Sequence, residues 1–142
     1  MKAKKDPNSV TALKKKAWDW FSKYIRLRDC LITTGTKERG KCITCGREKP
    51  FNELQAGHFI DSRSKSVLFV EDIVHAQCKQ CNLFKNGNKV VYRPKMVEIY
   101  GEKRVGEFEQ LINLPTTPWL KDDLKEIARY YEEEYKSTYE NN

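Results

Sequence analysis

The chain has 142 residues, of which 33% are charged, and its formal net charge is +7 at pH 7. This length suits one domain with a modest hydrophobic core. No apolar run approaches the ~20 residues that cross a bilayer, and the charged start does not form a signal peptide, so we expect a cytoplasmic protein without membrane segments.

Positive charge is concentrated towards the amino terminus. Residues 1–49 contain 14 Lys and Arg against 5 Asp and Glu, whereas residues 101–142 contain 6 against 10. A basic third in a chain with a pI of about 9.1 is typical of proteins that bind nucleic acid. A solvated lysine-rich surface would give the same composition without such a partner.

Residues 1–8 form a basic tip that we expect to be disordered, and residues 9–30 predict an amphipathic helix. Asn8 or Ser9 can cap this helix, and apolar residues recur at steps of three and four from Val10 onward. Its other faces are basic, which favours contact with phosphates; an ordinary amphipathic helix with a basic exposed side is the alternative. The side chains of this helix that we expect to contact nucleic acid are Lys14, Lys15, Lys16, Lys23 and Arg26.

Two matched pairs of cysteines follow, Cys42-x-x-Cys45 and Cys78-x-x-Cys81, with 32 residues between them. Four thiolates at this spacing are a strong signal for one tetrahedral zinc ion. Such a site has no open coordination position, so its zinc would be structural. A single CxxC could serve redox chemistry, but two pairs without a thioredoxin-like βαβ pattern argue against that role. The fifth cysteine, Cys30, is expected to be a buried apolar residue.

Short apolar runs lie between the cysteine pairs, and helical patterns follow them. Residues 54–60 are a strand candidate, and residues 67–70 form a second apolar run. A helix is expected to begin after Pro94 and to stop or kink at Gly101. A last helix should be capped by Thr117, followed by Pro118 in its first position, and its acidic end should fray.

Both histidines of the chain lie between the cysteine pairs. Gly57 precedes His58 at the end of the candidate strand, where an imidazole can act as general base towards a water that attacks phosphorus. Asn82 follows Cys81 at a helix start, where an amide oxygen can ligate a hard cation such as Mg²⁺. A histidine that is satisfied in the core or on the surface is the structural alternative.

Several short motifs occur in order within residues 40–112. They are Gly57-His58-Phe59, Val74-His75-Ala76-Gln77-Cys78-x-x-Cys81-Asn82, Lys85-Asn86-Gly87-Asn88 and Tyr92-Arg93, with Cys42-Ile-Thr-Cys45-Gly46 before them and Ile99-Tyr-Gly-Glu102 after them. Together they resemble the NinG/Rap family of recombination nucleases of lambda-like phages, within the HNH (ββα-metal) endonucleases. The resemblance covers about half of the chain.

This resemblance implies an α+β fold with a zinc-stabilised ββα-metal (HNH, treble-clef-like) core. The core would occupy residues 40–94, between the basic helix and a carboxy-terminal helical region over residues 95–142, all within one domain. It also implies that His58 is the general base, that Asn82 ligates a catalytic Mg²⁺ or Mn²⁺, and that the four paired cysteines hold structural zinc.

Two positions depart from the HNH pattern. Gly57 stands where many HNH enzymes have a metal-binding Asp, and Ile73 stands where the middle Asn of the motif is expected. We expect His75 to supply the missing metal ligand. Ile73 removes a polar group that would orient the base, which predicts reduced activity.

The family resemblance also implies the partners. Its members resemble structure-selective endonucleases of branched recombination intermediates, including Holliday junctions and D-loops, so we expect branched DNA and, for a phage protein, the host cytoplasm. Paired cuts on symmetry-related strands would suit a homodimer, and no organic cofactor is expected. A non-catalytic zinc module that binds nucleic acid and an HNH nuclease of linear or nicked duplex are the alternatives. Further expected DNA contacts are Arg63, Lys65, Lys85, Lys89 and Arg93.

Overall fold

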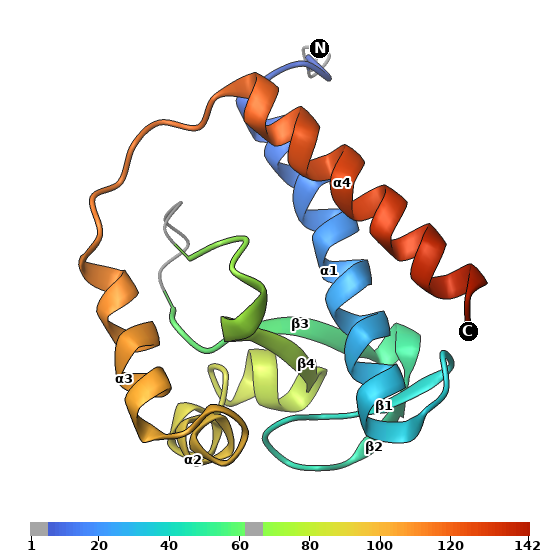
Figure 1. Cartoon of the computed structure of the whole chain (residues 1–142), viewed down its shortest axis with the longest axis vertical. Coiled ribbons are helices and arrows are strands. Elements are labelled where there is room, and N and C mark those ends of the chain that lie inside the picture. The colour runs from blue at the N-terminus through green and yellow to red at the C-terminus, as the bar shows by residue number, and fades with distance from the viewer. Residues whose placement is uncertain (1–5, 62–66) are drawn as a thin grey trace.

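A computed structural model describes residues 6–61 and 67–142 of the chain (Figure 1). It is a mixed α+β fold, as predicted. Of the basic tip expected over residues 1–8, residues 1–5 lie outside the described part. The elements in chain order are α1 (Val10–Thr34), β1 (Arg39–Lys41), β2 (Glu48–Pro50), β3 (Leu54–His58), β4 (Val74–Cys78), the π-helical turn η3 (Gln80–Phe84), α2 (Lys89–Tyr100), α3 (Glu102–Gln110) and α4 (Lys121–Glu140).

The predicted amino-terminal helix is present and extends beyond the expected end. Ser9 caps α1, because its hydroxyl oxygen accepts a hydrogen bond from the Ala12 N–H at 3.1 Å. Gly35 closes the other end in the left-handed conformation, with φ 74°, and donates its N–H to the Leu31 carbonyl. One face of α1 packs on the strands and another packs along α4 (Figure 1).

Two small antiparallel sheets lie at the end of α1. β1 pairs with β2, and β3 pairs with β4 in a register that places Gly57 opposite His75. Residues 67–70, the second apolar run of the sequence, do not form a strand. That run is a turn whose Val67 and Leu68 are buried, and the partner of β3 is the strand Val74–Cys78. All five residues of β4 are buried although two of them are polar, so apolar patterning did not reveal this strand.

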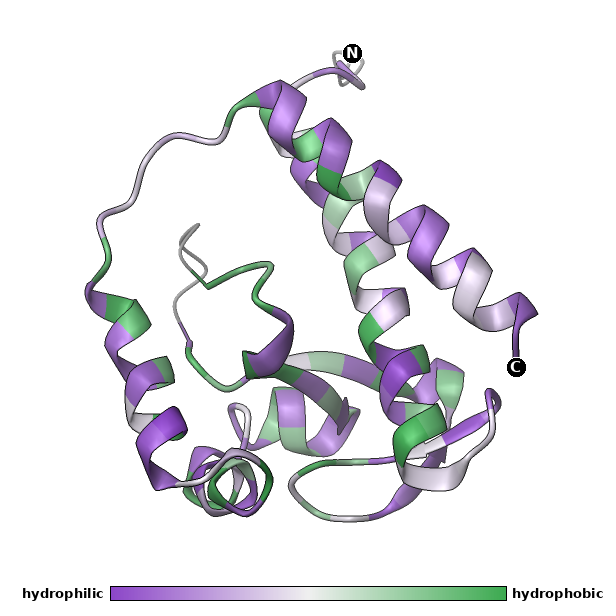
Figure 2. Ribbon diagram, in the orientation of Figure 1, coloured by the Kyte–Doolittle hydropathy of each residue, from purple (hydrophilic) through white to green (hydrophobic). Residues whose placement is uncertain are grey.

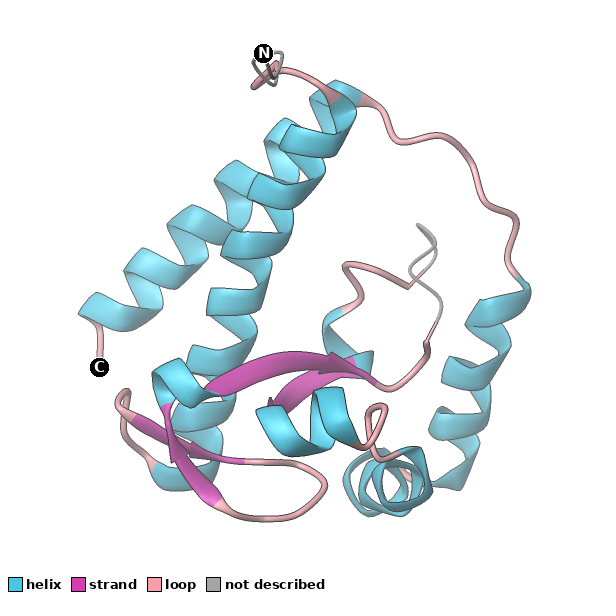
Figure 3. Cartoon of the chain, turned by 180° about the vertical axis from the view of Figure 1, so that it is seen from behind, coloured by secondary structure: helices cyan, strands magenta, loops and turns pink. Residues whose placement is uncertain are grey.

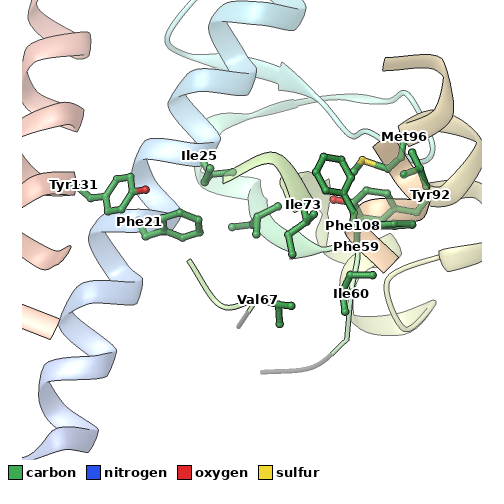
Figure 4. Packing of buried hydrophobic residues seen from close by; sticks show 13 residues of the cluster. Phe21, Ile25, Phe59, Ile60, Val67, Ile73, Tyr92, Met96, Phe108 and Tyr131 are labelled. Carbon is green, nitrogen blue, oxygen red and sulfur yellow. The ribbon is translucent and has the colours of Figure 1, made fainter. Parts of the chain in front are cut away.

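The main core lies between α1, the β3–β4 sheet, α2, α3 and α4 (Figure 4). Phe21 of α1 packs edge-on against Tyr131 of α4, with ring centroids 4.9 Å apart. Ile73 is fully buried in this cluster, and its carbonyl accepts the Phe59 N–H at 2.8 Å. Position 73 therefore fills the core directly before β4, which accounts for an apolar residue there.

α2 begins at Lys89, not after Pro94 as predicted. Pro94 lies within the helix and removes one backbone hydrogen bond. The helix continues through it because Tyr92 and Met96 are both fully buried in the core. Gly101, with φ 86°, separates α2 from α3, so the predicted break is confirmed.

The start and the end predicted for the last helix are wrong. Thr117 and Pro118 lie in an extended connection, and α4 begins at Lys121 without a side-chain cap. α4 continues to Glu140 instead of fraying, because one face is buried against α1 through Leu124 and its neighbours. The rest of α4 is hydrophilic (Figure 2). Among the described residues, no helix is long and apolar enough to cross a membrane.

Candidate functional site

The four paired cysteines converge on one point, as the sequence predicts. Their sulfur atoms all lie within 4.8 Å of one another, and Cys45 Sγ is 3.7 Å from Cys78 Sγ. Sulfurs that share one zinc at Zn–S distances of about 2.3 Å in tetrahedral geometry are about 3.8 Å apart. The four sulfurs therefore fit a structural zinc ion, which would join the turn Cys42–Gly46 (the first cysteine turn) to the end of β4.

Local hydrogen bonds favour the thiolate at Cys42. Burial raises its pKa, but the Cys45 N–H and the Thr44 hydroxyl, 3.5 Å and 3.3 Å from the sulfur, outweigh burial and lower the pKa to about 6. Gly46 adopts φ 75°, which closes the turn after the first pair. In the second half of the cluster, Asn88 Nδ2 donates to Cys81 Sγ at 3.6 Å. These donors fix the sulfurs in place for a metal.

A polar cavity of about 380 Å³ opens at the end of β3 and contains both His58 and Asn82. We call it the His58 cleft. Figure 3 shows that β3 and β4 lie side by side, with the short turn η3 packed below them. The residues that line the cleft are Trp18, Ala56, His58, Asp61, Asn82, Asn86, Gly87 and Lys89. The structure thus brings together the predicted base His58, which precedes the second cysteine pair in the sequence, and the predicted metal ligand Asn82, which follows it.

His58 is held in a defined orientation. Its ring stacks on Trp18, with centroids 5.0 Å apart and an interplanar angle of 17°. Nε2 lies 3.1 Å from the Leu68 carbonyl. Because a carbonyl only accepts, this hydrogen bond places the proton on Nε2 and makes Nδ1 the basic atom of the neutral ring.

Two further side chains organise the cleft. Asn82 Nδ2 donates to Gln55 Oε1 at 2.8 Å, which fixes the direction of its amide oxygen. Lys89 donates to the carbonyls of His58 and Phe59 and lies 3.3 Å from Asp61. Burial lowers the pKa of Lys89, which Asp61 partly offsets. Lys89, which the sequence predicts to contact phosphate, thus donates its hydrogen bonds to the backbone at the end of β3.

The structure does not bring His75 to this cleft, and the prediction that it shares a metal with Asn82 is not supported. His75 points away from the cleft, and both of its ring nitrogens have partners. Nδ1 lies 3.3 Å from Arg28 and 3.6 Å from Asp29, and Nε2 lies 3.2 Å from the Tyr100 hydroxyl. Although burial opposes it, hydrogen bonds and charge from His75 and Arg28 lower the pKa of Asp29. This buried network joins α1 to β4.

Gln77 fills the space that a side chain at position 57 would need. A Cβ added to Gly57 would lie 1.9 Å from Gln77 Oε1. Gln77 is fully buried, and its amide donates to the Gly87 carbonyl at 2.8 Å and to the Thr44 hydroxyl at 3.2 Å. Within the described residues its Oε1 accepts no hydrogen bond. Packing therefore accounts for a glycine at position 57, and Gln77 links the turn Cys42–Gly46 to the cleft.

Replacing Gly57 by Ala is expected to destabilise the protein by about 1–3 kcal/mol, because the fully buried Gln77 would have to shift and disturb its hydrogen bonds to Thr44 and Gly87. Urea unfolding measures this cost. Gly106→Ala is the matched control, since an added Cβ there meets nothing within 4 Å. An unchanged unfolding midpoint for Gly57→Ala would show that Gln77 can move. Adding Gln77→Ala to Gly57→Ala should cost less than the sum of the two single changes.

The residues predicted to contact DNA are dispersed. The four lysines of α1 expose or half-expose their side chains, whereas Arg26 lies over the Phe51 ring and donates to the Ser22 carbonyl. Arg93 is paired with Glu102 and Glu109. Lys85 is exposed, and Arg63 and Lys65 lie outside the described residues. Trp18 and Gln77 are site residues that sequence reasoning missed, because their roles come from contacts with distant segments.

The fold and the site define a small α+β protein in which a four-cysteine cluster that fits a metal ion lies beside a cleft with a histidine and an asparagine. The family model described as "Bacteriophage Lambda NinG protein" matches residues 2–141, and the chain belongs to this family.

Individual relatives agree with this assignment. Over 119 residues the chain is 29% identical to protein ninG of Escherichia phage lambda, and this match covers 81% of the chain and 57% of the relative. Protein ninG of Salmonella phage P22 is also 29% identical over 119 residues, with the same coverage. The chain thus spans little more than half the length of these relatives. No solved structure matches it.

Proposed function

We propose that this protein is a metal-dependent, structure-selective DNA endonuclease that acts on branched recombination intermediates, with His58 as the general base. The observation that carries the proposal is the placement of His58 and Asn82 in one polar cleft. The cleft forms where two antiparallel strands are followed by a short helical turn beside the cysteine cluster. This is the order of elements that the family resemblance implies for an HNH core.

The residues of the cleft suit hydrolysis of a phosphodiester. Nδ1 of His58 would take a proton from water as its oxygen attacks phosphorus, and the Leu68 carbonyl would steady the imidazolium that forms. The P–O3′ bond then breaks and the leaving oxygen takes a proton from solvent, which leaves a 5′-phosphate and a 3′-hydroxyl. Trp18 keeps the ring in its plane during this transfer.

The cleft offers oxygen donors for the divalent ion that such a reaction needs. Asn82 and Asp61 both line it, and an amide and a carboxylate oxygen are ligands that Mg²⁺ and Mn²⁺ accept. A bound ion would neutralise charge on the phosphate and on the leaving oxygen. Few protein ligands suffice, since Mg²⁺ keeps several waters and takes the rest of its shell from phosphate.

A non-catalytic nucleic-acid-binding module is the second candidate. It is favoured by the replacement of two polar HNH positions by Ile73, which is core, and by Gly57, which is packed under Gln77. A nuclease of linear or nicked duplex would share the cleft but not the substrate.

Labelled four-way junctions, flaps and linear duplexes of matched sequence distinguish these candidates. We expect cleavage only with added Mg²⁺ or Mn²⁺, and junctions should be cut at least about tenfold faster than duplex, a difference of ~1.4 kcal/mol. Equal rates on all substrates would remove the recombination role. Binding of every substrate without any cleavage would favour the non-catalytic module.

A further inference from the structure

Four apolar side chains near the His58 cleft face solvent within a stretch of nine residues. Leu83 is 50% exposed, Phe84 78%, Val90 90% and Val91 36%. The first two belong to η3 and the last two to the first turn of α2. None of the four is a member of the hydrophobic clusters found among the described residues. Exposed apolar residues that are this close together along the chain point to an interaction surface.

This apolar group flanks the cleft. The loop between its two halves contributes Asn86, Gly87 and Lys89 to the lining of the cleft, and Asn82 precedes Leu83 directly. In Figure 2 the short turn after β4 alternates between hydrophobic and hydrophilic residues. A partner that covers the apolar group therefore also reaches the entrance to His58.

The charge around the group selects the partner. Residues 79–97 contain five Lys and Arg and no Asp or Glu. Lys79 and Lys85 are exposed and form no ion pair within the described part of the chain. Two of the other exposed apolar residues lie next to acids, Ile99 beside Glu98 and Tyr139 beside Glu140. Apolar side chains among cations suit a polyanion that also has apolar faces, which is nucleic acid with accessible bases.

A second copy of the chain fits this surface less well. The acidic part of the protein that could meet these lysines is α4, and the apolar face of α4 is already buried against α1. Tyr130 and Tyr139, the apolar side chains that α4 leaves exposed, already contact Tyr131 and Lys37.

We propose that Phe84, supported by Leu83, is an apolar wedge that stacks on bases exposed at a DNA branch point, while Lys79 and Lys85 contact the flanking phosphates. Proteins insert Phe and Leu between base steps at the cost of unstacking them. That cost is smallest where the bases are already unpaired, so the wedge favours a branch over a linear duplex. This inference rests on the proposed function and adds the residues that select the substrate.

The test compares binding of a four-way junction and of a matched linear duplex, without added divalent cations, for wild type, Phe84→Ala and Phe84→Tyr. We expect Phe84→Ala to weaken junction binding about tenfold and duplex binding less than about twofold, and Phe84→Tyr to restore the difference. 2-Aminopurine placed at the branch should be quenched by wild type and not by Phe84→Ala. Ile32→Ala, an apolar truncation at a 73% exposed site on α1, is the matched control.

Three results would overturn the wedge. Phe84→Ala could bind the junction as tightly as wild type does, or wild type could bind the junction no tighter than the duplex. In sedimentation, Phe84→Ala could convert a dimer to a monomer with unchanged DNA binding, which would assign the surface to a second copy. A protein that binds junctions through Phe84 but never cuts them would refute the nuclease proposal alone. If Phe84→Ala leaves both the cleavage and the binding of junctions unchanged, the wedge alone is refuted.

Discussion

Cys78→Ser, or treatment of the wild type with a zinc chelator, is expected to abolish cooperative folding of the sheet region. Each strand of the β1–β2 pair has three residues, and isolated hairpins of that size are marginal in water. The four sulfurs lie within 4.8 Å of one another, so one bound ion would join this hairpin to β4 and η3. Binding free energies of structural zinc are about 10–16 kcal/mol at pH 7, which exceeds the stability of most small domains.

Zinc content and thermal unfolding together measure this effect. Metal analysis of the wild type should give about one zinc per chain, and Cys78→Ser should lose both the metal and the sharp unfolding transition. Cys30→Ala is the matched control, because Cys30 is a fully buried thiol outside the cluster. A wild type that contains no metal and unfolds at the same temperature as Cys78→Ser would contradict the zinc assignment.

The parts of the site that the sequence predicts well are those fixed by short-range chemistry. Two CxxC turns must each present two sulfurs on one side, so their spacing predicts the cluster that the structure contains. Asn82 directly follows Cys81, His58 ends the strand between the two cysteine pairs, and both line the same cleft.

The parts that the sequence hides depend on contacts between distant segments. β4 carries His75 and Gln77 in a fully buried strand, because the partners of these side chains come from α1 and from the first cysteine turn. Asp29, which lies 47 residues before Ala76, accepts the Ala76 N–H at 2.7 Å and shields this polar strand from a desolvation penalty. Periodicity cannot reveal a polar residue whose partner lies elsewhere in the chain, which is why the sequence did not show that His75 lies outside the cleft.

His58→Ala is expected to lower the cleavage rate of branched DNA by about 10²–10⁴-fold, the usual contribution of a positioned general base. DNA binding without divalent cations should remain within about threefold of wild type, a difference of less than about 1 kcal/mol. The reason is that His58 is not one of the exposed Lys and Arg side chains that would contact phosphates. Single-turnover cleavage with Mg²⁺, at saturating protein, separates the chemical step from binding.

His75→Ala is the control that makes this result specific, because it removes the other histidine of the chain. His75 is held by Arg28, Asp29 and Tyr100, away from the cleft. Its loss should therefore lower the melting temperature, because the buried Asp29 carboxylate loses one of its partners while it keeps Arg28 and the Ala76 N–H. The cleavage rate per folded molecule should change little. Equal loss of cleavage in both variants at a temperature where both are folded would contradict the assignment of His58. If His58→Ala cleaves DNA as fast as wild type, the general base does not lie in the His58 cleft.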